Sequence, residues 1–242
     1  MKTSRATLAS TTRRLVSEIY ASLDYRVLGL VYCHEGGDEF WRAKRNACYR
    51  LGSRVAAVLK RKLSRGGRSL YVGAGVAELP PLIMEAVELG RTVEPYNLRR
   101  PEVVALNRAF HSIPFMFHAM DASNAKGRFD HLWMASVLND PERFPHLSSL
   151  SYGRGHPLTF DPLKFGAERR IVRALVARCM GKLVRPGLVT TTTEEVLWIA
   201  EWCHRHRVSY IVGACSYPTA LVGDPICFIQ VGKGLKGARQ DS

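Results

Sequence analysis

The chain has 242 residues, of which 46% are hydrophobic and 23% are charged. These proportions are those of an ordinary soluble globular protein, and the length suits one domain with a substantial core and a small addition. No apolar run approaches the roughly 20 residues of a membrane-spanning helix. The N-terminal residues lack the apolar segment of a secretory signal. We therefore expect a cytoplasmic protein without a membrane span.

The formal net charge is +14, from 35 basic and 21 acidic residues. Such a field attracts anionic partners, which include nucleic acid, an acidic membrane surface and phosphorylated or carboxylated small molecules. The basic residues occur throughout the chain, and aromatic residues are not interleaved with them as on a base-stacking surface. They could equally be the solvated faces of helices. Nucleic-acid binding therefore stays open, and nothing in the sequence indicates an oligomeric state.

The cysteines are scattered among apolar neighbours, without a CxxC pair or a zinc-type Cys/His spacing. They are Cys33, Cys48, Cys179, Cys203, Cys215 and Cys227. We expect buried, reduced thiols and no metal site.

Residues 1–66 read as a helical extension or cap. Apolar residues recur at helical spacing between positions 15 and 31 and again between 40 and 63, with a break at 35–38. Tyr32, His34, Phe40 and Trp41 cluster around this break. They could line a substrate pocket, or they could only staple the two helices together.

From Arg68 onward, strand-like and helix-like segments alternate, which predicts a parallel sheet covered by helices. We expect seven strands, near residues 70–72, 90–95, 113–118, 129–136, 188–191, 209–213 and 226–231. No helix separates the last two, so they should pair antiparallel. Residues 142–165 are rich in Pro, Gly, His and Ser and read as a long loop, of the kind that often forms a lid or binding loop.

A glycine turn lies between the first strand and the first helix of this region. Gly73 and Gly75 let the backbone turn sharply and let a ligand approach bare amides at a helix N-terminus. A GxG pair alone is weak evidence, because a tight structural turn would also use it. Glu94, about 20 residues further on, stands where an acid can hold a ribose. Glu78 occupies the place of the third glycine of a dinucleotide fingerprint, and its charge would oppose a pyrophosphate. These positions predict a nucleoside-containing cofactor without phosphates beside the loop.

Taken together, these motifs resemble the class I S-adenosylmethionine-dependent methyltransferases. The resemblance rests on the glycine loop at 70–77, the stretches 92–94, 121–122, 129–138 and 184–187, and the closing hairpin. It implies an α/β, Rossmann-like three-layer sandwich with a seven-stranded, mostly parallel sheet whose last strand is antiparallel. The N-terminal helical extension (1–66) would precede a cofactor-binding core (67–242) that carries the insertion loop 142–165.

The resemblance also implies which residues hold S-adenosylmethionine. The glycine loop would cradle the methionine part, the acid after the second strand would bind the ribose, and the segment after the third would meet the adenine. The implied cofactor-binding residues are Gly73, Ala74, Gly75, Glu94, Pro95, Asp121, Ala122 and Ser136. The sequence departs from the family pattern at Tyr71, where the family often has an acid, and at Ala77, where glycine is common.

The chemistry is displacement at a sulfonium methyl group, so the protein mainly aligns the acceptor and removes its proton. Candidate bases are His34, Asn139, Asp140 and His156. We expect methyl transfer to a small-molecule acceptor that could be anionic. The alternatives are an RNA methyltransferase, an aminocarboxypropyl transferase that uses the same cofactor, and a degenerate binding domain without catalysis. Glu142 stands where base-amino methyltransferases have a second proline, which disfavours an acceptor on a nucleic-acid base.

Overall fold

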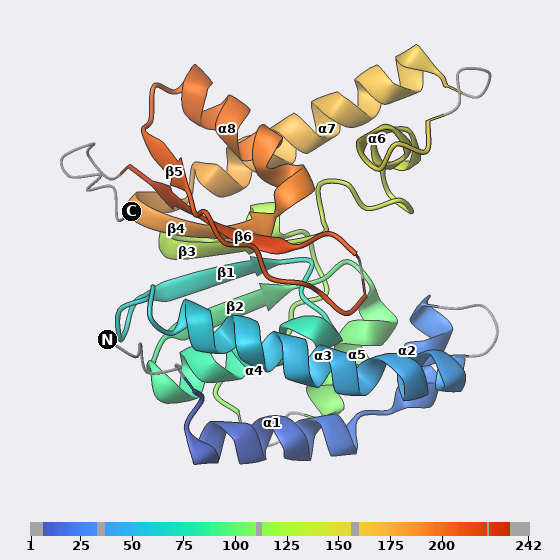
Figure 1. Ribbon diagram of the computed structural model, residues 1–242, viewed down its shortest axis with the longest axis vertical. Helices are drawn as coiled ribbons and strands as arrows, with labels where there is room; N and C mark the ends of the chain where they lie inside the picture. Colours follow the sequence, from blue (N-terminus) through green and yellow to red (C-terminus); the bar gives the residue numbers. More distant parts are fainter. Residues whose placement is uncertain (1–6, 33–36, 110–112, 156–159, 222, 233–242) are drawn as a thin grey trace.

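The computed structural model describes residues 7–32, 37–109, 113–155, 160–221 and 223–232. Its centre is a six-stranded sheet in the order β2-β1-β3-β4-β6-β5, covered by helices on both faces (Figure 1). The strands are β1 (Arg68–Val72), β2 (Thr92–Tyr96), β3 (Phe129–Met134), β4 (Leu183–Thr192), β5 (Tyr210–Val212) and β6 (Ile226–Val231). The pairs β2–β1, β1–β3 and β3–β4 are parallel, whereas β6 runs antiparallel to β4 and β5. The predicted antiparallel last strand is therefore confirmed.

The helices form two layers. One layer holds α1 (Ser10–Ser22), α2 (Tyr25–Tyr32), α3 (Gly37–Leu59), α4 (Leu79–Ile83) with its π-helical continuation Met84–Glu88, and α5 (Arg100–Ala109). The other holds α6 (Pro145–Ser151), α7 (Pro162–Met180) and α8 (Val196–Arg205). Short 3-10 turns span Val76–Glu78, Ala122–Asn124 and Thr193–Glu195. None of the described helices is long and apolar enough to cross a bilayer.

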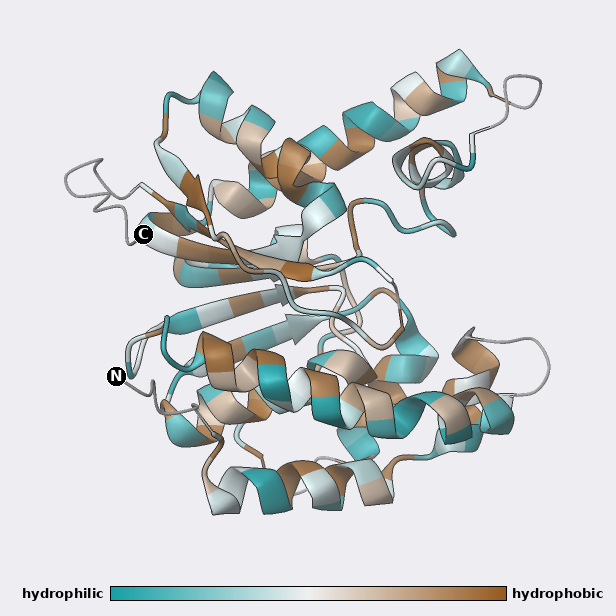
Figure 2. Cartoon of the chain, viewed as in Figure 1, coloured by the Kyte–Doolittle hydropathy of each residue, from teal (hydrophilic) through white to brown (hydrophobic). Residues whose placement is uncertain are grey.

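Alternating side chains of the central strands fill two apolar cores. Leu70 and Leu132 belong to the core beneath α7 and α8, and Tyr71 and Trp133 belong to the core on the side of α3 and α4. Because both faces of the sheet are buried, the central strands are apolar almost throughout, as parallel sheets require. The helices that cover them alternate hydrophobic and hydrophilic segments along their length (Figure 2).

The N-terminal helices share one core with the α4 side of the sheet. Val16 of α1 and Val55 of α3 are buried in the same apolar cluster as Leu82 of α4. The first predicted helix is in fact two, because the chain is extended at Leu23. Asp24 then accepts a hydrogen bond from the Val27 amide at 3.0 Å and so caps the N-terminus of α2.

The predicted strand at 113–118 is wrong, which is why the sheet has six strands rather than seven. This segment makes only an isolated bridge between Tyr96 and His118. The side-chain amide of Asn107 takes both polar backbone groups of Phe117: its Oδ1 accepts from the amide at 2.8 Å and its Nδ2 donates to the carbonyl at 3.0 Å. Pro114 has no amide to offer. Phe117 therefore satisfies its backbone groups without a strand ladder.

The predicted irregular loop at 142–165 is also partly wrong, because it contains α6 and the start of α7. Pro145 stands at the start of α6, where its missing amide costs nothing. Asp161 caps α7 by accepting from the amides of Leu163 and Lys164. Glu168 of α7 accepts from the Leu147 amide at 2.8 Å and so ties the two helices together.

Candidate functional site

The glycine loop joins β1 to the 3-10 turn before α4. Gly73 has φ +70°, and a Cβ added there would lie 2.7 Å from Cγ2 of Val137, so only glycine fits without strain. The amide of Ala74 donates to the carbonyl of Tyr96 at 3.0 Å, and Nδ2 of Asn97 donates to the carbonyl of Ala74 at 2.8 Å. The end of β2 therefore fixes the loop.

The second half of the loop is held by Glu78 and by α1. The amide of Gly75 donates to Oε2 of Glu78 at 2.8 Å, and the Glu78 amide donates back to the Gly75 carbonyl at 3.3 Å. The hydroxyl of Tyr20 donates to the carbonyl of Val76 at 2.8 Å. Pro80 and Pro81 stand in the first turn of α4, where proline is tolerated. These contacts fix the shape of the loop.

The segment after β3 is held by a buried carboxylate. Glu195 accepts hydrogen bonds from the amides of Ser136, Val137, Leu138 and Asn139 at 2.5 to 3.3 Å. Ser136 has φ 59°, a left-handed conformation that these bonds support. No motif in the sequence marks Glu195. The signal for it is the run of threonine and glutamate directly after the β4 strand pattern.

A cavity of about 320 Å³ lies at the carboxyl ends of β1 and β3, between the glycine loop and α3. Its walls are mostly apolar. They comprise Phe40, Cys48, Leu51, Gly52, Val55, Gly73, Gly75, Ala77, Glu78, Arg99, Trp133, Ala135, Ser136, Asp140, Pro141, Glu142, Pro218, Thr219, Ala220, Leu221 and Ile226. Gly52 brings α3 close, since a Cβ there would lie 3.0 Å from the carbonyl oxygen of Ala77. Ligands of open α/β sheets bind at this edge of the sheet.

The structure brings together some of the predicted cofactor residues. Gly73, Gly75 and Ser136 line the cavity, and Ala74 is buried within the loop. The predicted ribose and adenine contacts are not among the lining residues. Asp121 accepts from the Ser123 amide at 2.8 Å and caps a 3-10 turn, and Ala122 is buried in the core beside α7.

Glu94 and Pro95 lie within β2 rather than at its end. Glu94 stands opposite Leu70, three residues before Gly73, which is roughly 10 Å back along the strand. Its carboxylate forms an ion pair with Arg68 and accepts from the hydroxyl of Tyr96 at 3.3 Å. Asn97 is the polar residue that follows β2 and contacts the loop. No sequence motif had marked it.

Of the four candidate bases, Asp140 lines the cavity, 3.9 Å from the guanidinium of Arg99, which also pairs with Glu142 at 2.7 Å. Asn139 is buried, and its Oδ1 accepts from the indole of Trp198 on α8 at 3.3 Å. It does not line the cavity. His34 and His156 lie outside the described residues.

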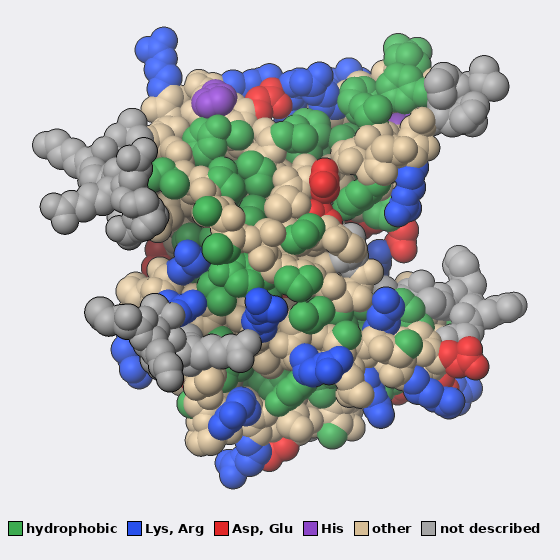
Figure 3. All heavy atoms as spheres, in the orientation of Figure 1, with side chains coloured by type: hydrophobic (Ala, Val, Ile, Leu, Met, Phe, Trp, Pro, Cys, Tyr) green, Lys and Arg blue, Asp and Glu red, His purple; other side chains and the backbone are tan. Residues whose placement is uncertain are grey.

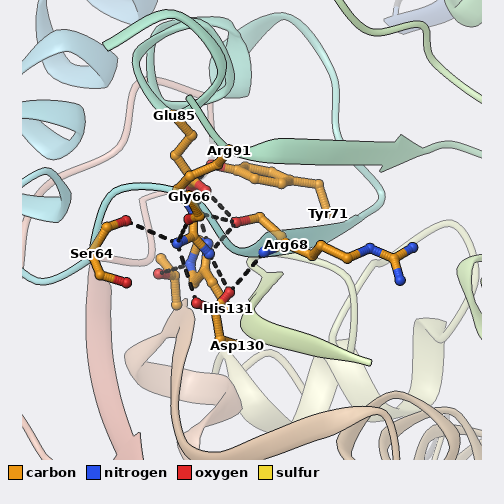
Figure 4. A network of polar contacts seen from close by, with 10 residues as sticks. Ser64, Gly66, Arg68, Tyr71, Glu85, Arg91, Asp130 and His131 are labelled. Carbon is orange, nitrogen blue, oxygen red and sulfur yellow. Dashed lines mark hydrogen bonds and ion pairs between the residues drawn. The ribbon is translucent and has the colours of Figure 1, made fainter. Parts of the chain in front are cut away.

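Tyr71 belongs to a buried polar network beneath the sheet, drawn in Figure 4. Its hydroxyl donates to Oε1 of Glu85 at 2.6 Å, and Nδ1 of His131 lies 2.9 Å from the same oxygen. Arg91 donates to the other oxygen of Glu85 at 3.0 Å and also pairs with Asp130. Burial alone would raise the pKa of Glu85, but His131 and the hydrogen bonds hold it below its usual value. Tyr71 therefore stands where class I methyltransferases often carry an acid, and its hydroxyl binds Glu85 within this network.

Comparison with solved structures identifies the architecture. Magnesium protoporphyrin IX methyltransferase from Synechocystis PCC 6803, solved with bound S-adenosylmethionine, superposes with a TM-score of 0.52 at 13% identity, over 92% of this chain and 98% of that one. The chain has the Rossmann-like fold of the class I methyltransferases.

Two further solved structures are similar at lower scores. Precorrin-6y C5,15-methyltransferase from Geobacter metallireducens GS-15 has a TM-score of 0.43 at 13% identity, over 75% of this chain and 89% of that one. Ribosomal protein L11 methylase from Lactobacillus delbrueckii subsp. bulgaricus has a TM-score of 0.46 at 11% identity, over 75% of this chain and 79% of that one. No protein-family model matches the sequence, and no curated protein sequence matches it.

Proposed function

We propose that the protein transfers a methyl group from S-adenosylmethionine to a small-molecule acceptor. The observation that carries this proposal is the cavity of about 320 Å³ beside the glycine loop, at the carboxyl ends of β1 and β3. Its volume falls at the lower end of the roughly 300–1,000 Å³ of small-molecule sites. Its walls, mostly apolar with a few carboxylates and one arginine, suit a compact and largely hydrophobic acceptor.

In this proposal the chain's own residues bind and align the reactants. Gly73 and Gly75 expose the loop backbone to the methionine part of the cofactor. S-adenosylmethionine supplies an already electrophilic methyl group, so alignment of the acceptor is the protein's main task. Asp140 is the candidate base that lines the cavity, and His34 and His156 stay candidates on sequence grounds. Glu94, Pro95, Asp121 and Ala122 stay predictions for the nucleoside part, and Asn97 is a further candidate beside the loop.

The similarity to magnesium protoporphyrin IX methyltransferase, which covers almost the whole of both chains, supports a small molecule as acceptor. On the face drawn in Figure 3, most Lys and Arg side chains are separated by apolar and neutral ones, so this face offers no single phosphate-binding strip. Cys48, Cys179, Cys203 and Cys227 are buried as expected, whereas the expectation is wrong for Cys215, which is exposed. The buried free thiols support a reducing, cytoplasmic location.

Calorimetric titration with S-adenosylmethionine tests the proposal. Wild-type protein is expected to bind it, and Gly73→Ala is expected to weaken binding at least tenfold, because a Cβ at φ +70° would meet Val137. Gly90→Ala is the matched control: Gly90 has φ +60°, but no atom lies within 4 Å of the added Cβ. It should bind within twofold of wild type. Absence of binding by the wild-type protein at millimolar S-adenosylmethionine would contradict the proposal.

An RNA acceptor is the second candidate, favoured by the net charge of +14. Phosphate contacts release counterions, so RNA affinity would then fall steeply with salt. A shallow or absent salt dependence of RNA binding would remove this candidate.

Product analysis separates the two transferase chemistries, because methyl transfer leaves S-adenosylhomocysteine and aminocarboxypropyl transfer leaves methylthioadenosine. A protein that binds the cofactor and forms neither product would be the non-catalytic domain.

A further inference from the structure

Glu78 is a carboxylate in the cavity wall with unused binding capacity. Its Oε2 accepts from the Gly75 amide at 2.8 Å, and the side chain forms no ion pair with any described residue. Trp133 lines the same cavity with only 2% of its surface exposed, and its indole Nε1 completes no hydrogen bond within the described ranges. The Glu78 carboxylate therefore has a backbone amide and the nearby Trp133 indole beside it, but no cation.

The groups that face Glu78 are acidic or neutral. They are Glu102 of α5, Cys48 of α3, Tyr20 of α1 and Tyr71 of β1. Burial, reinforced by Glu102, raises the pKa of Glu78 to about 7, although the Gly75 amide and the nearby Trp133 indole favour the ionised form. Glu78 is half-buried, and a carboxylate partly removed from water without a counter-charge is less stable than a paired one. A cationic ligand group in the cavity would supply that charge.

The neighbouring strand offers no alternative acid. Tyr71 occupies the position where methyltransferases of this fold often carry one, and its hydroxyl is bound to Glu85 beneath the sheet. Asp140 and Glu142 also line the cavity, but both face the guanidinium of Arg99. Glu78 is thus the carboxylate in the described cavity wall that lies within the loop and lacks a cation.

We propose that Glu78 binds the ammonium group of the methionine part of S-adenosylmethionine, in place of the acid that β1 lacks. This inference rests on the proposed function. The same carboxylate then has two roles: one oxygen fixes the Gly75 amide, and the other meets the cofactor. Binding of the ammonium favours the ionised carboxylate, so Glu78 loses its proton when the cofactor enters.

Two ligands separate this role from a purely structural one. S-adenosylhomocysteine carries the amino group, whereas methylthioadenosine lacks the whole aminocarboxypropyl chain. Glu78→Gln keeps an oxygen that can accept from Gly75 but removes the charge. We expect Glu78→Gln to weaken the affinity for S-adenosylhomocysteine about 10- to 100-fold, the range of a hydrogen bond between charged groups. The affinity for methylthioadenosine should change less than twofold. Glu194→Gln, which removes an exposed carboxylate outside the cavity, should change neither.

Proton exchange gives an independent readout. In calorimetry at pH 7 in two buffers of different ionisation enthalpy, wild-type protein should release protons on binding S-adenosylhomocysteine, because the raised pKa of Glu78 leaves part of the free protein protonated there. Affinity should rise between pH 5.5 and 7. Both effects should vanish in Glu78→Gln, and Glu78→Asp, which keeps the charge, should retain part of the affinity.

Equal losses for the two ligands would overturn the assignment, because Glu78 would then act only through the shape of the loop. Unchanged affinity for both would overturn it as well. Failure of wild-type protein to bind either ligand would contradict the proposed function itself, and this assignment with it. Thermal unfolding of Glu78→Gln shows whether the variant is folded.

Discussion

Single carboxylates hold the loops at the carboxyl edge of the sheet. Glu78 fixes the glycine loop through the Gly75 amide, and Glu195 fixes the segment after β3 through the amides of Ser136–Asn139. Burial raises the pKa of each to about 7. Their partners are mostly backbone amides, which almost any residue offers, and Glu195 also accepts from the Thr191 hydroxyl at 3.1 Å. This is why sequence motifs marked the loop at Gly73 but left Glu195 unnoticed.

Replacement of Glu195 by glutamine should destabilise the protein by about 3 kcal/mol, because the new amide nitrogen cannot accept from the amides that the carboxylate binds, and each buried unpaired donor costs roughly 1–3 kcal/mol. Urea unfolding measures the change. Glu194→Gln is the matched control: this neighbouring side chain is exposed, and its replacement should cost less than about 0.5 kcal/mol. Equal effects at the two positions would show that Glu195 does not hold the Ser136–Asn139 segment.

At the scale of elements, sequence patterns predict a segment's structure correctly where the residues that it contacts are close in the sequence. The strand, glycine turn and helix from Arg68 onward were predicted, since Gly73 needs φ +70° and the flanking residues have clear periodicities. The strand at 113–118 failed because the side chain of Asn107 takes the backbone groups of Phe117. The distance along the chain suggested Glu94 as the ribose acid, but pairing in register with Leu70 puts it within the strand. The register in which two strands pair depends on tertiary packing, so it cannot be deduced from the spacing of residues along the chain.

The contact between α3 and the glycine loop tests whether the N-terminal region shapes the site. Glycine to alanine in a helix normally stabilises by up to about 1 kcal/mol. At Gly52, however, the new Cβ would lie 2.8 Å from Cγ of Pro80 and 3.0 Å from the Ala77 oxygen. We expect Gly52→Ala to destabilise by about 1–3 kcal/mol and to weaken cofactor binding severalfold.

Gly166→Ala provides the comparison for Gly52→Ala. Gly166 lies within α7, and the added Cβ would meet only the flexible end of Arg170 at 3.8 Å. This variant should be slightly more stable than wild type in urea unfolding and should bind the cofactor normally. If Gly52→Ala is also slightly more stable than wild type and binds the cofactor normally, the contact between α3 and the loop does not shape the site.

At the scale of the whole molecule, the N-terminal helices and the sheet form a single apolar core on one face. Val16 of α1, Trp41 of α3 and Trp133 of β3 belong to the same buried cluster. The second core, beneath α7 and α8, is joined to the first through the sheet itself, since neighbouring side chains of β1 face opposite ways. The helical spacing of residues 1–66 predicts an extension or cap. The shared core predicts instead that this region unfolds together with the rest.

Val16→Ala tests that cooperativity, because Val16 is fully buried in α1, at the far end of the chain from most of the sheet. The truncation should lower the free energy of unfolding by about 1–2 kcal/mol, from the methyl groups removed and the cavity left. Since Trp133 lies on β3 and Trp202 on α8, tryptophan fluorescence reports on both cores, while circular dichroism reports on all helices. One urea transition, shifted equally by both probes, is expected. Two transitions, with only the first moved by Val16→Ala, would mean that residues 1–66 fold as a separate cap over an independently stable core.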